Sequence, residues 1–187
     1  MSTHADGPVI EQLSSRVVYE NTWMTLREDR IRRPDGSDGV YSVVHKPDFA
    51  LVIPAHDGGF HLVEEYRYPI GRRSWAFPQG SFPAGRDGSP EELARAELAE
   101  ETGLRAARLV RLGYLHCSHG TSGQGFHAFL ATDLDGGTPN REHEEQDMRQ
   151  AWVSREEFER MIRDGAITDD STVAAYTLLV MHERRQP

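Results

Sequence analysis

The sequence lacks the features that would place the protein in a membrane or in an oxidising compartment. Its 187 residues include one cysteine, Cys117, so no disulfide can form within the chain. No apolar run approaches the roughly 20 residues that a helix needs to span a bilayer. The polar residues 1–7 also lack the basic and apolar regions of a signal peptide. We therefore expect a cytoplasmic protein with no membrane partner.

Basic residues are outnumbered by acidic ones, 21 Lys and Arg against 30 Asp and Glu. The formal net charge is −9, and Lys46 is the single lysine. Because an acidic chain repels nucleic-acid phosphates, this charge argues against a broad nucleic-acid-binding surface but still permits a local basic pocket. The length is enough for one sizeable domain with a small N-terminal addition. The charged and hydrophobic fractions, 27% and 37%, are typical of a globular protein.

The most informative segment is a predicted acidic helix, residues 89–104, with the sequence SPEELARAELAEETGL. Ser89 is a favourable N-cap, and Glu92 three residues later completes a capping box. Pro90 occupies the first helical position, where a missing N–H group has no cost. Gly103 stands where a left-handed residue commonly ends a helix. The sequence therefore marks both ends of this helix.

Three carboxylates in this helix, Glu97, Glu100 and Glu101, are spaced three and four residues apart and so share one helix face. They lie near the negative end of the helix dipole, where carboxylates are disfavoured. Close oxygen ligands of this kind suit Mg²⁺ or Mn²⁺. A solvated acidic face is the alternative, and the spacing alone leaves both interpretations open.

The rest of the chain alternates strand and helix signals, which predicts an α+β or α/β fold. Strands are expected at residues 16–19, 23–33, 40–45, 49–54, 59–66, 74–77, 108–116, 125–134 and 148–153. A second helix follows the N-cap Ser154 up to Gly165, with Glu157 completing a capping box, and a third begins at Asp170 or Ser171.

The segment from Glu97 to Leu104, ELAEETGL, resembles the second half of the Nudix box, the signature of Nudix hydrolases. Gly80, in the sequence FPQG, resembles the glycine that opens this box. The arginine that normally precedes the first of these glutamates is Ala96 here, and the first glutamate of the box falls on Gly88. The resemblance implies that Glu97, Glu100 and Glu101, with Gly80 beside them, bind Mg²⁺ or Mn²⁺ at a diphosphate.

Three further segments resemble the branch of this family that contains ADP-ribose and nucleoside-diphosphate-sugar pyrophosphatases: residues 62–69, 75–80 and 152–171. That resemblance implies an α/β/α sandwich, with a mixed sheet between helices and an N-terminal antiparallel strand extension. It also implies a homodimer. We expect a flexible tail at residues 1–14, N-terminal strands that serve as a dimerisation element at 15–48, and a Nudix hydrolase domain at 49–187.

Diphosphate hydrolysis also needs a general base and groups that hold the substrate. The acidic loop 140–147 provides Glu144 and Glu145 as candidate bases, and Glu101 of the box is the alternative. For the substrate, the candidates are two arginines for phosphate, one tryptophan for a base and one histidine for the variable group: Arg67, Arg72, Trp75 and His119. The alternatives are surface ion pairs for the arginines and core packing for Trp75, which we favour.

Two classes of function follow. The first is Mg²⁺-dependent hydrolysis of a diphosphate bond in a nucleoside diphosphate linked to another group, such as ADP-ribose or a nucleotide sugar. The second is a nucleotide-binding or regulatory module on the same fold with weakened catalysis. The retained glutamates favour the first class, whereas Ala96, Gly88 and Ala76, which replaces a glutamate common in that branch, favour the second. In a third interpretation the glutamates face solvent and have neither role.

Overall fold

The computed structural model describes residues 9–82, 87–141 and 147–185. The protein divides into two compact units, Met1–Pro47 with His116–Gln124 and Asp48–Leu115 with Gly125–Pro187. The short segment His116–Gln124 therefore groups with the N-terminal strands. No helix within the described ranges is long and apolar enough to cross a membrane.

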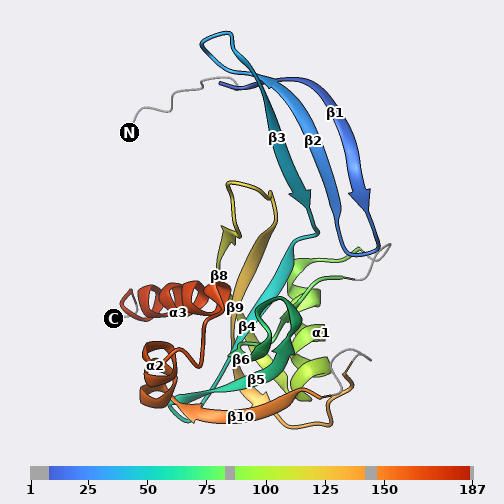
Figure 1. Ribbon diagram of the computed structural model, residues 1–187. Helices are drawn as coiled ribbons and strands as arrows, with labels where there is room; N and C mark the ends of the chain where they lie inside the picture. Colours follow the sequence, from blue (N-terminus) through green and yellow to red (C-terminus); the bar gives the residue numbers. More distant parts are fainter. Residues whose placement is uncertain (1–8, 83–86, 142–146, 186–187) are drawn as a thin grey trace. The chain divides into compact units, whose positions relative to one another are not determined.

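The N-terminal unit is an antiparallel three-stranded sheet in the order β1-β2-β3 (Figure 1). Its strands are β1 (Glu11–Glu20), β2 (Thr25–Arg32) and β3 (Asp38–His45). The antiparallel N-terminal extension is thus confirmed, but β1 begins at Glu11, inside the segment expected to be a tail. The segment 116–124 joins β3 through two bonds: Val44 N–H donates to the Thr121 carbonyl at 2.9 Å, and the Tyr41 hydroxyl donates to the Gly120 carbonyl at 2.8 Å.

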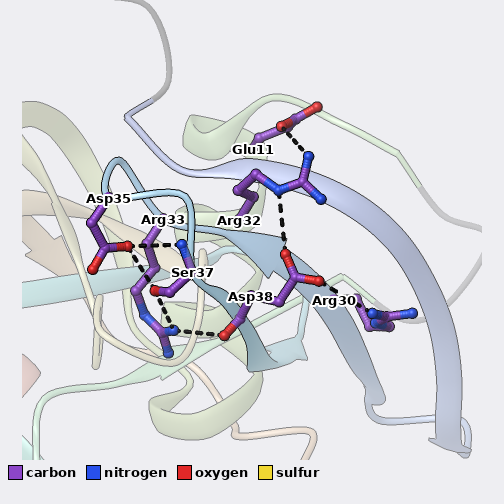
Figure 2. A network of polar contacts seen from close by, with 7 residues as sticks. All are labelled: Glu11, Arg30, Arg32, Arg33, Asp35, Ser37 and Asp38. Atoms are coloured by element: carbon purple, nitrogen blue, oxygen red, sulfur yellow. Dashed lines mark hydrogen bonds and ion pairs between the residues drawn. The ribbon is translucent and has the colours of Figure 1, made fainter.

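The turn between β2 and β3 is held by a polar network (Figure 2). The Asp35 carboxylate accepts hydrogen bonds from the Ser37 hydroxyl and the Ser37 N–H, which lower the pKa of Asp35. Arg32 Nε donates to Asp38 at 3.2 Å, and the Arg33 guanidinium donates to the Asp38 carbonyl at 2.9 Å. Exposed ion pairs of this kind add little to the free energy of unfolding, so we infer that they mainly fix the conformation of the turn.

The C-terminal unit is built on a mixed seven-stranded sheet with the order β10-β5-β4-β9-β8, in which β6 pairs with β5 and β7 pairs with β4. The strands are β4 (Phe49–His56), β5 (Gly59–Arg67), β6 (Arg72–Ala76), β7 (Gln79–Gly80), β8 (Arg105–His116), β9 (Gly125–Asp135) and β10 (Arg149–Ser154). Strands β4 and β9 are parallel, whereas β5 runs antiparallel to β4, β6 and β10. The predicted mixed sheet is confirmed.

Helices cover both faces of this sheet: α1 (Pro90–Thr102) on one side, α2 (Arg155–Arg163) and α3 (Asp170–Glu183) on the other (Figure 1). Because successive side chains of a strand point to opposite faces, β4 can serve both layers. Ala50 and Val52 pack against Leu98 of α1, while Leu51 and Ile53 are also fully buried. This arrangement is the expected sandwich.

Helix α1 has the two ends that the sequence predicts. The Ser89 side chain accepts from Glu92 N–H, the Glu92 side chain accepts from Ser89 N–H, and Pro90 is the first helical residue. Gly103 ends the helix with φ +73°. At α2, Ser154 caps the helix as predicted. The predicted capping box is not formed, because the Glu157 carboxylate accepts a hydrogen bond from Arg160 at 2.9 Å.

Substituting Gly103 tests the end of α1. We expect Gly103→Ala to lower the free energy of unfolding by about 2–4 kcal/mol, because a left-handed backbone and a steric clash add up. A Cβ atom at Gly103 would stand 2.5 Å from the Gly137 carbonyl oxygen. The control is Gly165→Ala, where φ is +74° but no atom of the described residues lies within 4 Å, so about 1 kcal/mol is expected. Equal losses in urea unfolding would contradict the assigned packing.

Candidate functional site

Two carboxylates of α1 are buried in the C-terminal unit. Glu97 is 9% exposed and Glu101 is 2% exposed, and they lie one helical turn apart. Glu100 is half-buried. Burying a carboxylate is costly unless hydrogen bonds, an opposite charge or a metal compensates. The burial therefore excludes the interpretation in which Glu97 and Glu101 simply face solvent.

Strand β7 lies directly against these carboxylates. The Gln79 N–H donates to Glu101 Oε1 at 3.2 Å. A Cβ atom at Gly80 would stand 2.5–2.7 Å from the carboxylate atoms of Glu97. Only glycine fits there without moving Glu97, which gives a physical reason for a glycine at the position that resembles the start of the Nudix box.

The C-terminal end of α1 is held by residues 140 and 141. Asn140 N–H donates to the Glu100 carbonyl at 3.0 Å, and Arg141 Nε donates to the Glu101 carbonyl at 3.0 Å. A second guanidinium nitrogen of Arg141 donates to the Met148 carbonyl. A cation at a helix C-terminus is also favoured by the helix dipole. Arg141 thus fixes the backbone from which Glu100 and Glu101 project.

Arg95, which stands next to the altered box position Ala96, does not hold the end of α1. Arg95 is exposed, bound to Glu91 at 3.0 Å and to the Ala106 carbonyl at 2.8 Å. Arg141 was not predicted from the sequence, because its contact with Glu101 joins residues 40 positions apart. The only hint in the sequence was that the acidic loop 140–147, which follows strand β9, contains a single arginine, Arg141.

Both sides of the acidic loop are anchored. Arg73 donates to the Glu64 carboxylate at 2.8 Å and to the Asp147 carbonyl at 2.9 Å, while Arg141 holds the residues on the other side. The candidate bases Glu144 and Glu145 lie outside the described residues.

The candidate substrate residues are distributed over several places. Arg67 lines a cavity of roughly 440 Å³ and forms an ion pair with Glu65. Burial raises the pKa of the Glu65 carboxyl, and the positive charge of Arg67 offsets only part of that rise. Arg72 donates to the Thr168 hydroxyl at 2.9 Å, which makes it a brace for the chain before α3. Trp75 is half-buried on β6 and does not belong to the described lining of that cavity. His119 is exposed in the N-terminal unit.

Binding a divalent metal requires several ligand side chains close together. Within residues 9–82, 87–141 and 147–185, no three Asp, Glu, His or Cys side chains gather closely enough to hold a metal ion. The three predicted ligands, Glu97, Glu100 and Glu101, do not form such a group there. Mg²⁺ commonly takes one or two carboxylates together with waters and substrate phosphates, and Glu97 with Glu101 fits that pattern.

Comparisons with known proteins agree with this geometry. The model of the NUDIX domain matches residues 44–176, and the model of the nucleoside diphosphate sugar hydrolase N-terminal domain matches residues 10–44. An ADP-ribose pyrophosphatase from Bacillus subtilis (strain 168) is 25% identical over 176 residues, which cover 93% of this chain and 94% of that protein. A methanol dehydrogenase activator from Bacillus methanolicus is also 25% identical, over 95% of this chain and 97% of its own.

A solved structure also matches the fold of this chain. The solved structure "Crystal structure of ADP compounds hydrolase" superposes with a TM-score of 0.84 at 20% identity and covers 96% of both chains. At that identity the likeness concerns the fold, including the N-terminal sheet and the sandwich.

Arg141 can be tested against a matched arginine. We expect Arg141→Ala to lower the free energy of unfolding by about 2–4 kcal/mol, since it removes two hydrogen bonds from a half-buried charged donor. The control, Arg149→Ala, removes an exposed ion pair with Glu64 at 3.3 Å and should cost less than about 1 kcal/mol. Denaturant unfolding of both variants measures the two losses. A loss for Arg141→Ala no larger than that of the control would contradict the role of Arg141 in holding the end of α1.

Proposed function

This chain belongs to the Nudix family, and on that premise we propose that it hydrolyses the diphosphate bond of a nucleoside diphosphate linked to another group, with Mg²⁺ or Mn²⁺ as cofactor. ADP-ribose and nucleotide sugars are the substrates of this class. The proposal is carried by the buried Glu97 and Glu101 against β7. The substrate class is further supported by the relatives named for ADP-ribose and ADP compounds.

The metal is assigned to the α1 carboxylates. Glu97 and Glu101 would hold it, with Glu100 at the half-buried edge and the Gly80 backbone beside them. A bound divalent cation neutralises phosphate charge and polarises the phosphorus for attack. The chain itself contributes the alignment: Gln79 fixes the Glu101 carboxylate and Arg141 fixes its backbone.

A general base must orient or deprotonate the attacking water. Glu144 and Glu145 are our candidates, because the residues on both sides of them are anchored by Arg141 and Arg73. Glu101 is the alternative base. Arg67 supplies a planar guanidinium suited to a phosphate, since one ion pair with Glu65 leaves further N–H donors. Roles for Arg72, Trp75 and His119 in substrate binding remain predictions.

A second candidate is a regulatory, nucleotide-binding module on the same fold. Ala96 and Gly88 at the two altered box positions favour it, and the similarity to a methanol dehydrogenase activator is in line with it. Metal-dependent nucleotide binding without turnover would support this candidate over the hydrolase.

Glu101 is the decisive position for catalysis. We expect Glu101→Gln to lower kcat/KM for ADP-ribose with Mg²⁺ by at least about 100-fold, because a neutral amide is a much poorer metal ligand and base. The matched control is Glu91→Gln, an exposed glutamate on the same helix, which should leave kcat/KM unchanged. Unaltered hydrolysis by Glu101→Gln would show that the proposed site is wrong.

We also propose a homodimer formed through the N-terminal sheet, in a cytoplasmic location that suits the single cysteine. Within the described part of the N-terminal unit, Ile31 is the one buried hydrophobic side chain. Large apolar side chains are exposed instead, namely Val17, Val18, Tyr19, Trp23, Val40 and Tyr41. A three-stranded sheet needs a covered apolar face for stability, and a second copy would provide that cover.

The dimer is tested by placing a charge on this sheet. Val40 is 56% exposed, and Val40→Asp should weaken self-association at least about tenfold, since it replaces buried apolar area with a carboxylate. Ser14→Asp, at an exposed polar residue of β1, is the control. Light scattering after size exclusion measures the mass. A monomeric wild-type protein, or a dimer unaffected by Val40→Asp, would contradict the proposal.

A further inference from the structure

A cavity of roughly 440 Å³ lies in the C-terminal unit between the short helix η1 (Tyr68–Ile70), strand β6 and the start of α3. Its volume is within the range of about 300–1,000 Å³ that is typical of small-molecule sites. Its lining combines one cation, two carboxylates, two hydroxyls and three apolar side chains: Arg67, Asp169, Asp170, Ser74, Thr168, Pro69, Ile70 and Ala76.

Ser74 is the residue that points to a ligand. Its side chain is buried, with 7% of the residue exposed, and its hydroxyl has no hydrogen-bond partner among the described residues. The nearby Thr172 hydroxyl, by contrast, accepts from Phe77 N–H at 3.0 Å. Because buried polar groups are almost always hydrogen-bonded, the Ser74 hydroxyl needs a partner that enters the cavity.

The charges of the wall restrict the chemistry of that partner. Asp169 and Asp170 would repel an anionic group in addition to the phosphate assigned to Arg67. No aromatic ring occurs among the described lining residues, so the cavity offers no surface on which a nucleobase could stack. Carboxylates accept hydrogen bonds only, whereas serine and threonine hydroxyls both donate and accept, so together they match a neutral group rich in hydroxyls. Pro69 and Ile70 offer an apolar surface for its C–H face.

Gln79 connects this cavity to the carboxylates of α1. Its side-chain amide donates to Asp169 Oδ2 at 3.3 Å, and its backbone N–H donates to Glu101 Oε1 at 3.2 Å. Arg67 adds a positive charge to the same cavity, on the side chain already assigned to a phosphate. A group held in the cavity would therefore adjoin the site of diphosphate cleavage.

We propose that this cavity binds the sugar attached to the diphosphate, with the Ser74 hydroxyl and the Asp170 carboxylate hydrogen-bonded to sugar hydroxyls. This inference rests on the proposed function and refines it: recognition of the sugar resides in η1, β6 and the start of α3. Ser74 becomes a specificity residue that neither holds the metal nor takes the proton.

The experiment compares Ser74→Ala with the wild type on two substrates. ADP-ribose carries the sugar, whereas the methyl ester of ADP keeps the adenosine and the diphosphate and has a methyl group in its place. We expect Ser74→Ala to lower kcat/KM for ADP-ribose at least about fivefold and to leave kcat/KM for the methyl ester unchanged. The melting temperature should stay the same or rise, because the variant removes a buried unpaired hydroxyl. Ser42→Ala, at an exposed serine of β3, is the control and should change neither substrate.

The outcomes separate this inference from the proposed function. If the wild type hydrolyses ADP-ribose and Ser74→Ala alters both substrates equally or neither, the sugar site is wrong while the hydrolase stands. If the wild type hydrolyses neither compound, the proposed hydrolase fails, and calorimetric binding decides the sugar site. In that case Ser74→Ala must weaken binding of ADP-ribose without weakening that of ADP, and equal effects on the two ligands would overturn the inference.

Discussion

The burial of two carboxylates on one turn of α1 is the constraint on which the rest of the C-terminal unit depends. Glu97 and Glu101 are removed from water on the inner face of a helix that also supplies Leu98 to the core. Such burial is costly, so the surroundings must be built to accommodate it. Strand β7 does so with a glycine that leaves room for Glu97 and a backbone N–H that reaches Glu101.

Arginines provide much of the support around this site, but mainly through backbone carbonyls. Arg141 binds the carbonyls of Glu101 and Met148, and Arg73 binds those of Glu64 and Asp147. Arg72 binds the Gly165 carbonyl before α3. A guanidinium has several donors in a fixed plane, which suits such bridging. We therefore interpret the loss of the arginine at Ala96 as a change in how the helix is held, with Arg141 fixing its end from a distant loop.

The sequence predicted what depends on neighbouring residues. The limits of α1 follow from Ser89, Glu92, Pro90 and Gly103, all of which act within a turn of the helix. Most strands also lie within a few residues of their predicted bounds. The partners of α1 were not predictable, because Arg141 and Gln79 meet it only once the chain has folded. Ser74 gave no signal at all, since an unpaired hydroxyl is visible only when its burial is known. The grouping of residues 116–124 with the N-terminal strands is likewise a property of the folded chain.

The central claim is that the buried carboxylates of α1 bind a divalent metal without the usual box arginine. Titration of Mn²⁺ followed by electron paramagnetic resonance, in the presence of ADP, tests it directly. We expect saturable Mn²⁺ binding to the wild type. Binding should be at least about tenfold weaker for Gly80→Ala, whose added methyl group displaces the Glu97 carboxylate. Absence of Mn²⁺ binding by the wild type, or equal affinity in the variant, would contradict it.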